Sequence, residues 1–160
     1  MKRFVLSAAA VLLMSTAAFA AGDKVKEIDV TLKIDAVTNP AAALRYANTA
    51  DDLKNAIAAR LIDRTDPDEG VTIDINLSDV ELSNSFTEIV GSADTRLVGD
   101  VKVTEGPSMK NEYQLTVDVN QAKVFFPEGV DMTKLSASSD EFYTSMITAF
   151  ADAVVVRLDQ

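Results

Sequence analysis

The chain contains no cysteine, no histidine and no tryptophan. Without cysteine it has no disulfide and no thiolate nucleophile, and without histidine it lacks the commonest general base. Catalytic Cys-His and Ser-His-Asp arrangements, Cys/His zinc sites and histidine-ligated haem are therefore excluded. An enzyme of this composition would have to work with carboxylates alone, and no pair of Asp or Glu residues stands out in the sequence.

Positive charge is scarce. The 160 residues include 15 Lys and Arg against 25 Asp and Glu, so the formal net charge at pH 7 is −10. The sequence has no basic patch interleaved with aromatics, and its glycines form no phosphate-binding loop. Such an acidic chain repels nucleic acids and anionic membrane surfaces, so we expect neither as a partner.

Residues 1–20 have the pattern of a secretory signal peptide. Lys2 and Arg3 form a positive start, an apolar stretch runs from Phe4 to Leu13, and Ala18-Phe19-Ala20 fits the A-x-A cleavage rule. We expect cleavage after Ala20, which leaves 13 basic and 25 acidic residues and a formal charge of −12. An uncleaved membrane anchor is the alternative, but the apolar stretch is short for a bilayer span. Lipid attachment behind the cleavage site is excluded because it requires a cysteine.

Export without cysteine indicates a bacterial protein of the periplasm or the medium, since small secreted animal domains usually depend on disulfides. Residues 21–160 have the length of one ordinary domain. A domain of this size can bury a sufficient core without disulfides. We therefore expect a single cysteine-free domain behind a cleaved signal peptide.

Four segments alternate between apolar and polar residues, as half-buried strands do. They are residues 28–34, 71–77, 97–103 and 113–119. The clearest is Val71–Leu77 (V-T-I-D-I-N-L), and the change of parity after it predicts a bulge or bend near Ser78-Asp79. Residues 104–112 are expected to turn the chain between the last two strands, and residues 83–96 show no clear pattern.

The first expected helix lies between the first two strands. It begins near Asn39-Pro40, a favourable N-cap and first helical residue, and ends near Asp63. A break is expected near Asn48, because residues 49–52 (T-A-D-D) offer a second helix start.

The second expected helix ends the chain. It begins at Ser138, which forms a capping-box pattern with Glu141, and its apolar residues then recur every four positions to Leu158. Met146 and Phe150 on this stripe are expected in the core, as are Phe125 and Phe126 before the helix. If the stripe were exposed, it would instead be a surface for a partner.

The order β-α-β-β-β-α predicts an α+β fold. A two-layer sandwich, with a four-stranded mixed sheet and two helices packed on one face, accounts for every apolar stripe. The opposite face of the sheet would be polar. Its residues would include Thr31, Lys33, Thr72, Asp74, Asn76, Asp100, Lys102, Thr116 and Asp118.

Several stretches resemble a family of short, exported, uncharacterised bacterial proteins. They are A-I-A-A-R-L-I-D-R (56–64), V-T-I-D-I (71–75), L-S-N-S (82–85), L-V-G-D-V (97–101), L-T-V-D-V-N (115–120), F-P-E-G (126–129) and A-F-A-D-A-V-V (149–155). The resemblance covers nearly the whole chain after the signal peptide. It implies a single exported domain and assigns no activity or functional residue. The order of elements is also similar to small α/β modules of the bacterial envelope such as the N-terminal domain of TolB, a likeness of topology alone.

Two groups of residues are candidate sites. The polar sheet face offers an interaction surface made of Thr72, Asp74, Asn76, Asp100, Thr116 and Asp118. The turn before the second strand carries Asp63, Asp66, Asp68 and Glu69, which could ligate calcium, although their spacing does not match an EF-hand. Solvated residues account for either group as well, so no metal, cofactor or catalytic residue is assigned.

These observations favour a non-enzymatic periplasmic domain that interacts with another envelope protein or assists envelope assembly. The alternative is a small-ligand or cation binder that uses the acidic 63–69 turn or the polar sheet face. No membrane anchor is expected after signal cleavage, and the oligomeric state is left open.

Overall fold

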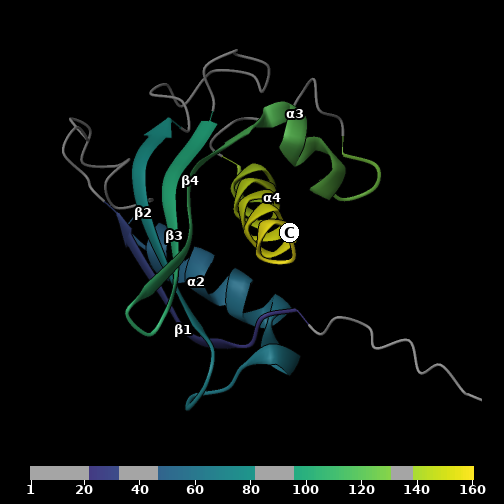
Figure 1. Ribbon diagram of the computed structural model, residues 1–160. Coiled ribbons are helices and arrows are strands. Elements are labelled where there is room, and N and C mark those ends of the chain that lie inside the picture. Colours follow the sequence, from purple (N-terminus) through teal and green to yellow (C-terminus); the bar gives the residue numbers. More distant parts are fainter. Residues whose placement is uncertain (1–21, 33–46, 82–95, 131–138) are drawn as a thin grey trace, which may run out of the picture.

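The computed structural model of the protein describes residues 22–32, 47–81, 96–130 and 139–160 (Figure 1). Four strands form one sheet in the order β1-β2-β3-β4. They are β1 (Val25–Leu32), β2 (Val71–Glu81), β3 (Arg96–Glu105) and β4 (Ser108–Asp118). β1 runs parallel to β2, whereas β2, β3 and β4 are antiparallel to their neighbours.

Two helices, α2 (Thr49–Arg60) and α4 (Asp140–Leu158), cover one face of this sheet (Figure 1). This arrangement confirms the predicted α+β sandwich, with its mixed four-stranded sheet and its order of elements. None of the helices in the described ranges has the length and apolar character needed to cross a bilayer. The predicted signal peptide, residues 1–20, lies outside the described residues.

The centre of the sheet is β2, because it pairs with β1 on one side and β3 on the other. Val71, Ile73, Ile75 and Leu77 are at most 2% exposed, so this side of the strand is core from residue 71 to residue 77. Its pairing with β3 shifts register between Leu77 and Asp79. The bulge predicted at Ser78-Asp79 is thus confirmed, and it keeps the end of the strand in the sheet despite the change of parity.

The two helices complete the core and are tied to each other. Met146 and Phe150 of α4 are fully buried, as predicted. Tyr143 Oη of α4 donates a hydrogen bond to Asp52 Oδ2 of α2 at 2.7 Å. At the other end of α2, Arg60 Nη2 donates to the carbonyl oxygen of Thr148 at 3.2 Å. Hydrogen bonds therefore link α2 and α4 at both ends of their apolar contact.

The predicted start of the first helix lies in 33–46, outside the described residues. The break predicted near Asn48 agrees with the N-cap of α2, which is Asn48. The helix ends at Arg60, earlier than predicted, and a 3₁₀ turn, η1 (Ile62–Arg64), continues the chain past Asp63.

The expected turn over residues 104–112 is too long. Only Gly106 and Pro107 separate β3 from β4, and Gly106 has a φ of 54°, in the left-handed region that favours glycine. β4 therefore begins at Ser108. Its first five residues are all exposed and show no alternation, which is why the sequence pattern does not reveal them.

The last strand, expected over residues 113–119, ends one residue earlier, at Asp118. The chain turns there into a short helix, α3 (Val119–Ala122), and a 3₁₀ turn, η2 (Lys123–Phe125). Phe125 and Phe126, which were expected in the core, are only partly buried and pack against its surface. The cap of α4 is Ser139, one residue later than predicted, and its Oγ accepts the N–H of Phe142 at 3.1 Å.

Candidate functional site

The face of the sheet opposite α2 and α4, called the open face below, carries rows of polar side chains from all four strands. Residues paired across a sheet point to the same side, so the register defines the rows. One row consists of Asp29, Asp74, Lys102 and Glu112. The next consists of Thr31, Asn76, Asp100 and Gln114. No helix of the described ranges packs on this face (Figure 1).

The second row contains one hydrogen bond between its own side chains and one to the backbone of β2. Gln114 Nε2 donates to Asp100 Oδ1 at 3.1 Å, and Thr31 Oγ1 donates to the carbonyl oxygen of Ile75 at 3.4 Å. Asn76 Oδ1 is buried and accepts no hydrogen bond in the described part of the chain. The row therefore presents a mixed polar surface with one buried acceptor, Asn76 Oδ1, that has no partner among the described residues, and no pair of carboxylates bonded to each other.

The predicted interaction residues are largely brought together. Thr72, Asp74, Asn76, Asp100 and Thr116 all lie on the open face. Asp118 instead caps α3: its Oδ1 accepts the N–H groups of Asn120 at 2.8 Å and Gln121 at 3.1 Å. Gln121 Oε1 in turn accepts the N–H of Asp118 at 2.8 Å, which completes a capping box for α3.

The acidic turn is organised around Asp66. Its Oδ2 lies 2.6 Å from Lys24 Nζ, and its Oδ1 accepts the N–H groups of Asp68 and Glu69, both at 3.1 Å. The hydrogen bond from Lys24, helped by these two N–H groups, lowers the pKa of Asp66 to about 2. The backbone N–H of Asp66 also donates to the carbonyl of Val25 at 2.9 Å, which ties the turn to β1.

The turn therefore uses its central carboxylate internally. Asp63, Asp66, Asp68 and Glu69 do not form a set of ligands, because no group of three or more acidic side chains that could hold a metal occurs within residues 22–32, 47–81, 96–130 and 139–160. The arrangement stabilises the entry into β2 and the start of β1.

The outer edge of β4 is the second notable feature of the sheet, because no strand of the described residues pairs with it. Natural proteins protect such edges with bulges, charges or proline. The first half of β4 has these devices: the register shifts between Val103 and Thr104, which leaves Lys110 as an extra residue, and Glu112 follows.

The second half, Tyr113–Val117, is called the edge segment below and has none of these devices. Its register with β3 is regular, and its sequence, Y-Q-L-T-V, is uncharged and rich in residues that favour strands. Leu115 and Val117 are buried, whereas Gln114 and Thr116 are exposed on the open face. The guanidinium of Arg157 lies 4.7 Å from the ring centroid of Tyr113 and covers it from the helix side.

Sequence reasoning identified the alternation of this strand but missed its place at the edge. Alternation reports which face of a strand is buried and carries no information about its lateral neighbours. The sequence alone shows that residues 113–117 contain no charge and no proline. This absence becomes informative only once the strand is known to lie at the edge of the sheet.

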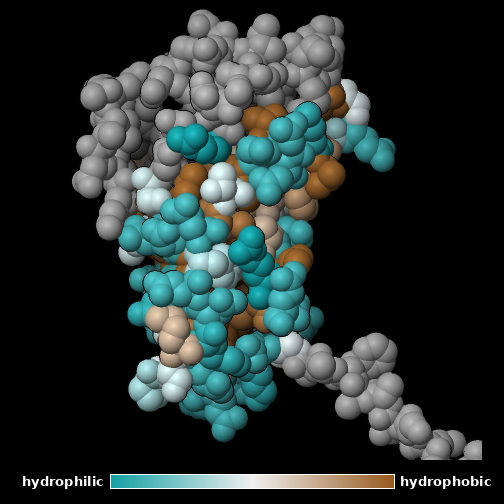
Figure 2. Space-filling model, turned by 45° about the horizontal axis from the view of Figure 1, so that its top comes forward, coloured by the Kyte–Doolittle hydropathy of each residue, from teal (hydrophilic) through white to brown (hydrophobic). Residues whose placement is uncertain are grey.

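A small apolar surface lies around α3 (Figure 2). Val124 is 80% exposed there, beside the partly buried Phe125 and Phe126. Residues 131–138, which follow, lie outside the described part of the chain. The patch therefore carries no functional assignment.

No protein-family model matches the chain, and no curated protein matches it either. The case for a function consequently depends on the geometry of the open face and of the edge segment.

Proposed function

We propose that the protein is an exported periplasmic binding domain that takes up an extended segment of another envelope protein as a fifth strand. In this proposal, residues 1–20 direct export and are removed after Ala20. The incoming segment pairs with the edge segment, Tyr113–Val117. The domain has no catalytic role.

The observation that carries the proposal is the unprotected half of an otherwise protected edge strand. Strand addition obtains affinity from main-chain hydrogen bonds and specificity from the side chains beside the edge. The edge segment offers a regular backbone with no charge, bulge or proline to prevent pairing. The protective devices at Lys110 and Glu112 limit pairing to this half of β4.

The open face supplies the neighbouring side chains. Gln114 and Thr116 belong to the edge segment, and Asp100 lies directly beside Gln114 on β3. An added strand would place alternate side chains next to these polar groups. The pattern favours a partner segment with polar residues on that side, whose hydrogen-bonding groups match the Gln114–Asp100 pair.

The cation-binding alternative has less support. The carboxylate of Asp66 is already bonded to Lys24 and to two backbone N–H groups. On the open face, Lys102 lies between Asp74 and Glu112 and supplies the local positive charge that a cation would otherwise provide.

A photo-crosslinking residue at Thr116 tests the proposal in intact cells. Thr116 is exposed and lies on the edge segment, so a bound strand would be within reach of the probe. The matched control is the same probe at Asn55, which is exposed on α2. We expect one discrete crosslinked product from position 116 and none from position 55. Equal products from both positions, or none from either, would contradict strand addition.

A pair of charge variants makes the test independent of the probe. Gln114→Lys with Thr116→Lys adds two charges beside the edge, which opposes strand pairing. Asn55→Lys with Ala59→Lys adds the same charge to the exposed side of α2. With a probe at Asp100, we expect the first pair to abolish the crosslinked product and the second pair to leave it unchanged.

A further inference from the structure

The open face carries more negative than positive charge. Its acidic side chains, among those that the structure describes, are Glu27, Asp29, Asp74, Asp100, Glu112 and Asp118. Its basic side chains, on the same basis, are Lys102 between Asp74 and Glu112, and Arg96 opposite Asp118. A strand added to β4 would extend this face sideways, so it would enter a negative potential.

Two carboxylates of this face lie beside the edge segment. Glu112 directly precedes the segment, and Asp100 is the β3 partner of Gln114. Both are exposed, and neither forms an ion pair with another described residue. A basic residue opposite Glu112 would make a favourable cross-strand pair, whereas an acidic residue there would be repelled. Asp100 lies two strand spacings from the added strand, about 10 Å, where charges still attract at ordinary ionic strength.

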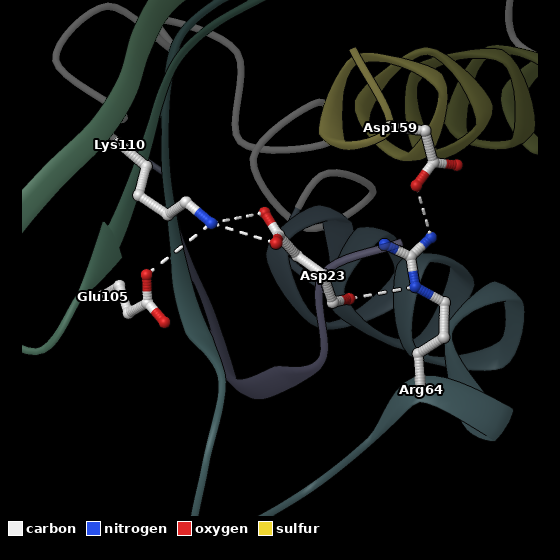
Figure 3. Close-up of polar contacts among 5 residues, drawn as sticks. All are labelled: Asp23, Arg64, Glu105, Lys110 and Asp159. Atoms are coloured by element: carbon white, nitrogen blue, oxygen red, sulfur yellow. Dashed lines mark hydrogen bonds and ion pairs between the residues drawn. The ribbon is translucent and has the colours of Figure 1, made fainter. Parts of the chain in front are cut away.

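The positive charge of Lys110, the basic residue of β4 nearest to these carboxylates, is used within the domain. Its Nζ lies 2.9 Å from each carboxylate oxygen of Asp23 and 3.6 Å from Glu105 Oε2 (Figure 3). Asp23 is held in turn by Arg64, whose Nε donates to its carbonyl oxygen at 3.0 Å. Because Lys110 is bound in this way, it leaves the carboxylates beside the edge segment uncompensated.

The helix side of the edge segment carries the opposite charge. Arg157 is exposed, and its guanidinium lies 4.7 Å from the ring centroid of Tyr113. Leu115 and Val117, which face the same side, are buried and apolar. A basic residue of the added strand that faced α4 would meet Arg157 as a like charge. Since side chains of a strand alternate between its two faces, basic residues are favoured at every second position only.

We propose that the strand added to Tyr113–Val117 is a basic segment, with Lys or Arg at alternate positions on the open-face side and uncharged residues toward α4. The inference rests on the proposed strand addition and names the chemistry of the partner. A second copy of this chain is a poor match, because its net charge is −10 and it would bring the same acidic face. Charge complementarity of this kind selects one partner among many extended segments.

Three synthetic peptides of equal length test the proposal on the purified protein. The first alternates lysine with valine, the second alternates glutamate with valine, and the third has the composition of the first with all its lysines in one block. We expect the alternating lysine peptide to bind at least about tenfold more tightly than either of the others. Equal affinity for the lysine and glutamate peptides would overturn the basic partner. Equal affinity for the alternating and block peptides would overturn its alternation.

A pair of conservative substitutions locates the charge that attracts the peptide. Asp100→Asn with Glu112→Gln should weaken binding of the alternating lysine peptide about threefold to tenfold and strengthen binding of the glutamate peptide. The matched control, Asp63→Asn with Asp68→Asn, removes the same charge from exposed residues of the acidic turn, which lies beside β1 at the other edge of the sheet. Equal weakening by both pairs would show that only the net charge matters and would contradict the proposal.

Amide hydrogen exchange of residues 113–117 separates this inference from strand addition itself. We expect the alternating lysine peptide to protect the outward amides and the glutamate peptide, at the same concentration, to leave them exchanging rapidly. Equal protection by both peptides would overturn the basic partner and leave strand addition standing. Protection by none of the three peptides would overturn both, because the edge segment would then accept no strand.

Discussion

A side chain at position 99 would press against the ring of Phe150. A Cβ added to Gly99 would be 3.0 Å from Cζ of Phe150 and 3.1 Å from Cδ2 of Leu77. Glycine weakens a strand interior by itself. Here it allows α4 to approach the middle of β3, and the fully buried ring fills the gap.

Gly99→Ala should therefore destabilise the fold even though alanine suits the backbone of a strand. Overpacking of this kind costs about 1–3 kcal/mol, measurable as a lower midpoint in urea unfolding. Phe150→Leu alone should destabilise by leaving a gap, and the double variant should recover part of both losses. Strict additivity of the two losses would show that the side chains at 99 and 150 do not compete for the same space.

The stability at acid pH should depend on Asp66. Because its pKa is lowered from 3.8 to about 2, chiefly by the hydrogen bond from Lys24, the ionised carboxylate stabilises the folded state. This contribution is present above about pH 4 and is lost as the pH falls toward 2. Asp66→Asn should flatten the loss of thermal stability over that interval. The control is Asp68→Asn, since Asp68 contributes its backbone N–H to the turn. A change of slope in the control as large as in Asp66→Asn would speak against this assignment.

The carboxylate of Asp118 should matter for stability as a helix cap. Asp118→Ala removes the acceptor of two N–H groups and should cost about 0.5–2 kcal/mol in urea unfolding. Asp118→Asn keeps an oxygen acceptor that caps helices equally well, so it should stay close to the original stability. If the Asn variant were as unstable as the Ala variant, the negative charge rather than the cap would be the important property.

Much of the fold was predictable because strands with one wet face repeat every two residues and helices do not. Val71–Leu77 predicted both the central strand and the bulge that follows it, since a change of parity in a continuous strand requires an extra residue. The stripe through Met146 and Phe150 predicted the buried side of α4 in the same way.

The remaining features depend on contacts between distant residues, which no local pattern contains. The sequence does not predict a strand over residues 108–112, because an exposed hairpin end need not alternate. The pattern of Ser138 and Glu141 predicts a cap one residue too early, because only the geometry of the first turn shows that Ser139 is the cap of α4. Asp118 has its role because the chain turns into α3 there. The contacts of Asp23 with Lys110 and Arg64 join residues 87 and 41 positions apart.

The central claim, that the outer edge of Tyr113–Val117 is open to an added strand, can be tested most directly by amide hydrogen exchange measured by NMR on the protein alone. In an antiparallel edge strand, alternate N–H groups point toward the neighbouring strand and the others point outward. We predict that exchange alternates along residues 113–117, with the amides directed at β3 protected and the outward amides exchanging rapidly. Uniform protection of all five amides would show that the edge is already covered within the protein and would contradict the proposed mode of binding.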